Sequence, residues 1–167
     1  VQEARMVPII EPEVLMDGEH NINKCYEVTV KVLKECYKEL NLHNVNLKGT
    51  ILKPNMILPG NKSKDKSKAT EIAKMTLKCL KESVPSEVPG IAFLSGGQED
   101  YQATRNLFQI SRKSREFSTP WELTFSFGRA VLSSALHTWN GNTNFVRNAQ
   151  DIIINRLRSN SNARVHV

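Results

Sequence analysis

Four short apolar segments, each followed by a stretch with helical periodicity, constrain the fold of this chain most strongly. They span residues 7–10, 50–52, 91–94 and 123–125, and each ends in polar residues or glycine. Almost continuously apolar strands that alternate with helices are typical of a parallel sheet covered by helices. We therefore predict an α/β fold built from four βα units.

The spacing of apolar residues predicts the helices between these strands. The first three are expected over residues 22–40, over 72–80 with an end at Val84 and Pro85, and over 98–110; the fourth is expected over 130–139. A break at residues 140–142 then precedes a last amphipathic helix, which carries the apolar residues Phe145, Ala149, Ile152, Ile153 and Leu157. Because the chain has no repeats and no low-complexity linker, we expect a single domain over residues 1–167.

The amino-acid composition limits the kinds of binding partner that we expect for this chain. The chain is 40% hydrophobic and 24% charged, as in ordinary soluble globular proteins, and no apolar run approaches the length of a membrane span. The net charge is +6, and the densest lysine stretch, residues 62–68, has no aromatic neighbours for stacking on bases. We therefore predict no nucleic-acid partner and no membrane partner. The lysine stretch is expected to be a solvated loop, or at most a means of concentrating a phosphorylated substrate.

The three cysteines and the first residue also carry information. Cys25, Cys36 and Cys79 form no CxxC pair, and no histidine lies at metal-ligand spacing from them. We expect reduced thiols, a cytoplasmic protein and no metal site. The chain begins with Val1 rather than Met, so its start is expected to be cut or processed.

Lys53 directly follows the second apolar segment, where another aliphatic residue would be expected. Burial disfavours its charged form and leaves some neutral amine, which is the form that attacks a carbonyl to make a Schiff base. An isolated lysine at such a position more often extends its flexible stem to solvent. The neighbouring strand ends therefore decide between the two interpretations.

The other three strands end in residues with matching chemistry. Glu11 and Glu13 follow the first strand two residues apart, so both carboxylates are expected on one face, where repulsion favours a proton on one of them. Glycines at a strand-to-helix turn let the backbone approach an anion, and an arginine adds a fork of donors that fits phosphate oxygens. The third strand ends in one such turn and the fourth in another; their residues are Ser95, Gly96 and Gly97, and Ser126, Gly128 and Arg129.

An amine nucleophile, a carboxylate proton carrier and a phosphate anchor together suit one kind of substrate. A phosphorylated ketone or aldehyde would be held by its phosphate while Lys53 forms an iminium. The iminium withdraws electrons, so that a neighbouring C–C bond can break or form.

Four segments of the chain resemble class I fructose-1,6-bisphosphate aldolase. They are residues 10–13 (Ile-Glu-Pro-Glu), 52–56 (Leu-Lys-Pro-Asn-Met), 93–98 (Phe-Leu-Ser-Gly-Gly-Gln) and 120–130 (Pro-Trp-Glu-Leu-Thr-Phe-Ser-Phe-Gly-Arg-Ala). The resemblance implies that Lys53 is the Schiff-base lysine, that Glu11 is the acid/base and that Glu13 supports it. It implies that the C1 phosphate is held by Ser95, Gly96, Gly97, Ser126, Gly128 and Arg129.

The same resemblance implies an overall reaction and an assembly. The reaction is the reversible cleavage of fructose 1,6-bisphosphate to dihydroxyacetone phosphate and glyceraldehyde 3-phosphate in glycolysis, with no cofactor and no metal. The assembly is a cytoplasmic homotetramer of (β/α)₈ TIM barrels. The four βα units and the C-terminal helix correspond to the second half of such a barrel.

A half-barrel leaves alternatives open. The chain is either a fragment of a full aldolase, which we favour, or a genuine half-length relative that pairs with itself or with an N-terminal half-barrel. Its function is either aldol cleavage or, in a catalytically inactive form, binding of a sugar phosphate or a protein partner. A deoxyribose-phosphate aldolase or transaldolase is disfavoured, and a preference for fructose 1-phosphate is left open. The last residues, 162–167, do not resemble the family's tail, which ends in tyrosine.

Overall fold

The structure, a computed structural model, describes residues 1–164 of the chain, so the last three residues of the tail discussed above lie outside the described residues. Its strands are β1 (Ile9–Ile10), β2 (Ile51–Leu52), β3 (Gly90–Phe93) and β4 (Glu122–Phe125). All neighbouring pairs are parallel, and the strand order in the sheet is the chain order, β1-β2-β3-β4. The predicted parallel sheet of four strand–helix units is confirmed.

Helices follow each strand as the periodicity predicts. They are α1 (Ile22–Leu42), α2 (Ala69–Ser83), α3 (Asp100–Ser114), α4 (Arg129–Trp139) and α5 (Val146–Arg164), with short 3₁₀ turns at Gln2–Ala4, Leu47–Gly49 and Thr143–Phe145. Local sequence signals explain where two of these helices begin or end. The Asn21 side chain accepts a hydrogen bond from the backbone N–H of Lys24 and caps α1, and α2 stops one residue before Val84-Pro85.

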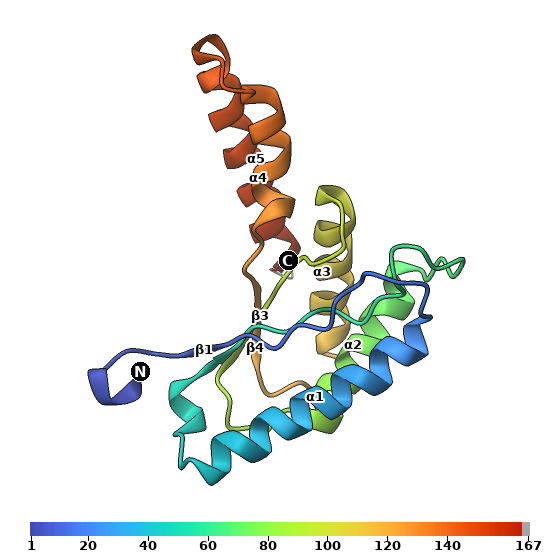
Figure 1. Ribbon diagram of the computed structural model, residues 1–167, viewed down its shortest axis with the longest axis vertical. Coiled ribbons are helices and arrows are strands. Elements are labelled where there is room, and N and C mark those ends of the chain that lie inside the picture. The colour runs from blue at the N-terminus through green and yellow to red at the C-terminus, as the bar shows by residue number, and fades with distance from the viewer. Residues whose placement is uncertain (165–167) are drawn as a thin grey trace.

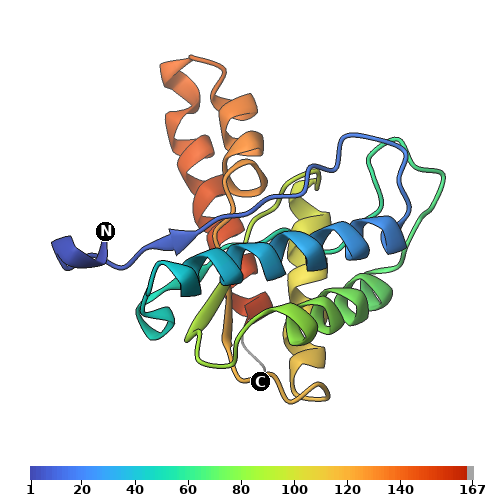
Figure 2. The ribbon, with the colours of Figure 1, turned by 60° about the horizontal axis from the view of Figure 1, so that its bottom comes forward.

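The core lies between the sheet and the layer formed by α1, α2 and α3. Leu52, Ile91 and Phe93 of the strands have no exposed surface, and they belong to the same buried cluster as Leu33, Leu77 and Leu107 of the three helices. In Figure 1, α4 and α5 run side by side and project away from the sheet, and the turned view in Figure 2 shows the same arrangement. The chain reverses between these two helices at Asn140 (φ 42°) and Gly141 (φ 72°), as the predicted break requires.

Two sequence expectations differ from the structure. The third helix begins at Asp100 rather than at residue 98, because Glu99 has an extended backbone (φ −70°, ψ 158°) and is the N-cap of the helix. Phe145 does not belong to the last helix, since it ends the preceding 3₁₀ turn and is 46% exposed.

The lysine-rich stretch at residues 62–68 forms part of a loop between β2 and α2, and its four lysines are exposed. The loop is nevertheless anchored. Ser63 is buried, and the Asp65 carboxylate accepts a hydrogen bond from the backbone N–H of Ile22 at the start of α1.

Candidate active site

The four strand exits are tied to one another by backbone hydrogen bonds beyond the last paired residues of the strands. The N–H of Lys53 donates to the carbonyl of Ile10 (2.7 Å), that of Leu94 to Pro54 (3.1 Å), and that of Ser126 to Phe93 (2.8 Å). Each exit is therefore held against the exit of the preceding strand. Because the strands are parallel, the predicted site residues of all four units lie at one edge of the sheet.

Lys53 and Glu11 form an ion pair at this edge. The Lys53 Nζ lies 2.9 Å from the Glu11 Oε1, and the two side chains are 21% and 49% exposed. Lys53 is thus largely covered, while its partner reaches solvent. A carboxylate at hydrogen-bond distance can accept a proton from the ammonium and leave the neutral amine, which is the nucleophilic form.

Glu13 lies further along the same edge, against the turn that follows β3. A Cβ atom built on Gly96 would sit 2.3 Å from the Glu13 Oε1, so any side chain at this position would displace the carboxylate from its place. Glu11 and Glu13 therefore reach two different strand exits, one towards Lys53 and the other towards Gly96.

The first glycine loop, defined as residues 95–97, is a tight turn. Ser95 is buried and its carbonyl accepts a hydrogen bond from the N–H of Gln98. Gly97 has a φ of +73°, and a Cβ there would meet the Met16 side chain at 2.5 Å. Both the backbone angle and the space require glycine at this position.

The second glycine loop, defined as residues 126–129, leads directly into α4. Gly128 is the N-cap and Arg129 the first residue of that helix, and both are exposed. No atom lies within 4 Å of a Cβ built on Gly128, and among residues 1–164 Arg129 makes no ion pair. A helix start with an adjacent unpaired guanidinium is a favourable place for an anion.

Asn55 is a site residue that sequence reasoning did not single out. It is 3% exposed; its Oδ1 accepts from the N–H of Val14 (3.0 Å), and its Nδ2 donates to the Thr29 Oγ1 (3.2 Å). It thereby fixes the segment that carries Glu11 and Glu13 to the exit that carries Lys53. The available signal was an amide residue inside an otherwise apolar run, residues 54–58.

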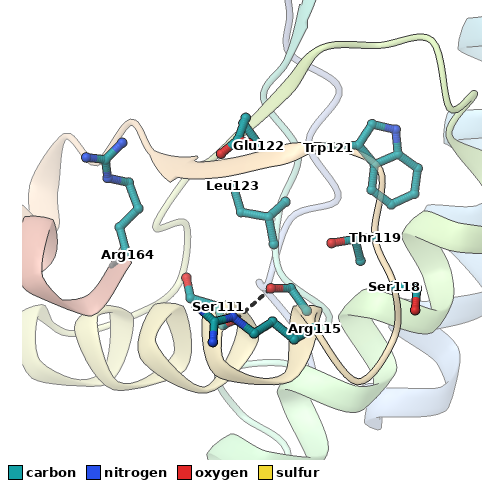
Figure 3. Close-up of a pocket in the computed structure, with 9 residues that line it drawn as sticks. Ser111, Arg115, Ser118, Thr119, Trp121, Glu122, Leu123 and Arg164 are labelled. Carbon is teal, nitrogen blue, oxygen red and sulfur yellow. Dashed lines mark hydrogen bonds between the residues drawn. The ribbon is translucent and has the colours of Figure 1, made fainter. Parts of the chain in front are cut away.

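A polar cavity of about 250 Å³ lies at the other end of β4, away from these residues (Figure 3). Arg115, which directly follows α3, Thr119 of the loop before β4 and Arg164 of α5 line it together with the first residues of β4. None of the nine predicted site residues lines this cavity. This cavity therefore belongs to a different surface from the strand exits.

Three further features of the described part of the chain concern metal-ligand clusters, membrane-spanning helices and free thiols. No cluster of three or more His, Cys, Asp or Glu side chains within residues 1–164 could hold a metal ion, and no helix there is both long and apolar enough to cross a membrane. Cys25, Cys36 and Cys79 are free thiols, and burial raises the pKa of Cys25 and Cys79. Raised thiol pKa values disfavour the reactive thiolate.

Comparison with protein families gives a match along almost the whole chain. The family model described as fructose-bisphosphate aldolase class-I matches residues 1–166. Cytosolic fructose-bisphosphate aldolase 6 of Arabidopsis thaliana is 48% identical over 162 residues, which are 97% of this chain and 44% of that protein. The cytoplasmic isozyme of Spinacia oleracea is 47% identical with the same coverage, and chloroplastic aldolase 2 of Pisum sativum is 43% identical over 164 residues, 98% of this chain and 46% of that protein.

A solved structure agrees with the sequence relatives. The fructose-bisphosphate aldolase of Plasmodium falciparum, in a complex with TRAP and a small-molecule inhibitor, superposes with a TM-score of 0.92 at 41% identity. The match covers 98% of this chain and 46% of that chain. The chain thus spans a little less than half the length of the relatives it matches.

Proposed function

Because the chain belongs to the class I fructose-bisphosphate aldolase family, we propose that its strand exits form the Schiff-base part of an aldolase active site. The proposed reaction is the reversible cleavage of fructose 1,6-bisphosphate to dihydroxyacetone phosphate and glyceraldehyde 3-phosphate. The observation that carries the proposal is the 2.9 Å contact between Lys53 and Glu11, at the same edge of the sheet as both glycine loops.

The first steps follow from this contact. Glu11 takes a proton from the Lys53 ammonium, and the neutral amine attacks the ketone carbon to give a carbinolamine. Glu11 then returns the proton to the carbinolamine hydroxyl, which leaves as water, and the C–N double bond forms. The iminium accepts the electron pair of the bond that breaks in the sugar.

The remaining predicted residues have supporting roles in the proposal. Glu13 would stay beside Gly96, on the side of the turn that faces the substrate. The two glycine loops, including Arg129, would hold the C1 phosphate. A helix start and a guanidinium supply the donors that a phosphate needs. No cofactor takes part in this chemistry.

We expect complete cleavage to require groups from outside this half-barrel. Since the chain spans 44% of its curated relatives, we propose that full activity needs an N-terminal half-barrel or a second copy of the chain to close the barrel. A glycolytic role in the cytoplasm and a homotetramer belong to the same proposal. The cytosolic and cytoplasmic names of the most similar relatives support the location.

Reductive trapping tests the proposal without requiring the complete barrel. Wild-type protein treated with dihydroxyacetone phosphate and borohydride should gain one covalent adduct, which peptide mapping by mass spectrometry places on Lys53. Lys53→Arg keeps the cation but cannot form the Schiff base, so it should gain no adduct. Lys48→Arg, an exposed lysine of the preceding turn, is the matched control and should be trapped like wild type.

The outcome distinguishes catalysis from binding alone. Glu11→Gln should slow trapping by about 100-fold or more, because it removes the proton acceptor. A folded wild-type sample that gains no adduct, but still binds the phosphate, would favour the inactive sugar-phosphate-binding alternative over the aldolase.

A further inference from the structure

Arg156 of α5 lies between the first turns of α3 and α4. Its side chain is 16% exposed. Its Nε donates to the carbonyl of Ala130 (3.1 Å), and one terminal nitrogen donates to the carbonyl of Asp100 (2.6 Å). One guanidinium therefore spans two helix starts that come from different βα units.

Further polar contacts surround this guanidinium. The same terminal nitrogen donates to the Thr104 Oγ1 (2.7 Å), and the Thr104 hydroxyl lies 2.7 Å from the Oδ1 of Asn160, which has no exposed surface. The Asp100 carboxylate lies 3.8 Å from the Arg156 Nε and accepts a hydrogen bond from the Ser134 hydroxyl. The network joins α3, α4 and α5 through the buried Asn160, the half-buried Arg156, Thr104 and Asp100, and the exposed Ser134.

The two carbonyls bound by Arg156 lie shortly after the two glycine loops, in the first turns of α3 and α4. Asp100 is the first residue of α3 and lies three positions after Gly97, while Ala130 directly follows Arg129. The two loops follow separate strands. A side chain from a third element, α5, therefore bridges the gap between them. Arg156 would therefore set the distance between the two glycine loops that are proposed to hold the phosphate.

Electrostatics argues against a purely stabilising role for this cation. A positive charge at the start of a helix opposes the helix dipole, and here one charge faces the starts of two helices. Asp100 offsets part of this repulsion. The same positive charge does favour an anion bound at those helix starts, which an apolar side chain of similar length would not.

We propose that Arg156 is a positioning residue, which holds the two glycine loops at the separation that binds the phosphate of a phosphorylated ketone. The inference rests on the proposed function and deepens it. Arg156 does not touch the substrate in this proposal. It acts through the backbone of Asp100 and Ala130, and through its charge.

Arg156→Lys tests the proposal, because it keeps the charge but cannot span both carbonyls with a planar fork. The ketone concentration that half-saturates borohydride trapping on Lys53 should rise about tenfold or more with dihydroxyacetone phosphate, as expected for the loss of a charge-assisted hydrogen bond. With dihydroxyacetone, which has no phosphate, it should stay unchanged. Arg158→Ala, an exposed arginine of the same helix, is the matched control and should behave as wild type with both ketones.

The two ketones separate positioning from a general loss of structure. Equal changes with both, or no change with either, would overturn the proposal. Thr104→Val, which removes one hydrogen-bond partner of Arg156 and keeps the side-chain shape, should show a smaller effect in the same direction. This variant keeps the test decisive if Arg156→Lys fails to fold.

Titration of wild type and Arg156→Lys with inorganic phosphate, followed by ³¹P NMR, separates this inference from the proposed function. If wild type gains no adduct on Lys53, the Schiff-base proposal alone is refuted. If the two proteins bind phosphate with equal affinity, or if wild type binds no phosphate, the role of Arg156 is refuted. Weaker phosphate binding by Arg156→Lys supports it.

Discussion

At the scale of single residues, the backbone on both sides of Lys53 fixes the position of this lysine. Its N–H is bonded to the carbonyl of Ile10, and Pro54 and Asn55 behind it are buried. The lysine stem therefore has little freedom, and its ammonium meets Glu11 rather than open solvent. A residue that could have extended into water is instead held in a geometry suited to proton transfer.

Gly60 provides a test of close backbone packing. A Cβ at this position would lie 2.3 Å from the carbonyl oxygen of Gly18, which is backbone and cannot rotate away. We expect Gly60→Ala to lower the free energy of unfolding by about 1–3 kcal/mol, as overpacking does elsewhere. Urea denaturation measures the change.

Gly128→Ala is the matched control, since open space surrounds the position and its φ is −90°. It should change the stability by less than about 1 kcal/mol. Equal destabilisation by the two variants would contradict the packing argument at Gly60.

Cys79 provides a test of stability against pH. Burial raises its pKa from 9.0 to about 12, so the folded protein keeps this proton at pH values where the unfolded chain has lost it. The stability contribution is complete below about pH 9 and is lost as the pH rises towards about 12, with a slope of at most about 1.4 kcal/mol per pH unit.

Urea denaturation of wild type and Cys79→Ala at about pH 8 and about pH 10 measures this slope. The wild-type protein should lose more stability over the interval than the variant. Comparing slopes rather than absolute values removes the effect of the small cavity that alanine leaves. Parallel slopes would show that Cys79 does not titrate as its burial predicts.

At the scale of elements, Asn55 couples the segment after β1 to the exit of β2 and to α1. Asn55→Ala leaves the N–H of Val14 without its buried acceptor, which should cost about 1–3 kcal/mol of stability in urea denaturation. The variant should also slow trapping on Lys53, because the Glu11 segment loses its anchor. Asn41→Ala, at an exposed asparagine of α1, should leave both measurements unchanged.

At the scale of the whole molecule, apolar surface is uncovered in two places, beside the edge strand β1 and between α4 and α5. One groove beside β1 is lined by Ile10, Val32, Cys36, Leu40 and Val45, and another between α4 and α5 is lined by Leu132, Leu136, Trp139, Val146 and Ile153. An uncovered strand edge next to apolar surface promotes association with another chain.

We therefore expect the isolated chain to associate as its concentration rises, which sedimentation velocity can measure. Ile9→Lys places a charge on the edge strand, and Leu136→Lys places one in the second groove. Either change should shift the protein towards the monomer. Ser133→Lys, on an exposed position of α4, adds the same charge outside the groove and should have little effect. A monomer at all concentrations would contradict the expectation.

Local patterns in the sequence determined the elements and their order. Apolar runs, helical spacing and breaks such as Asn140-Gly141 depend on neighbouring residues, so the four strands, the following helices and the reversal before α5 were predictable. The start of α3 was misplaced by two residues, because Glu99 gives no side-chain cap signal for the helix that begins after it. The residue types at the strand exits were predictable for the same reason, as were Lys53, Glu11 and the two glycine loops.

Only the tertiary structure decided which of these residues meet. Four contacts each join residues 26 or more positions apart: the pairing of Glu11 with Lys53, the approach of Glu13 to Gly96, the bridge made by Asn55 and the clamp made by Arg156. Such contacts depend on the register of the parallel strands and on where α5 packs. The sequence alone therefore determined the chemistry available at the edge of the sheet, while packing decided its geometry, because hydrogen bonds and ion pairs form only where the polar atoms of distant segments are brought within about 3–4 Å of each other.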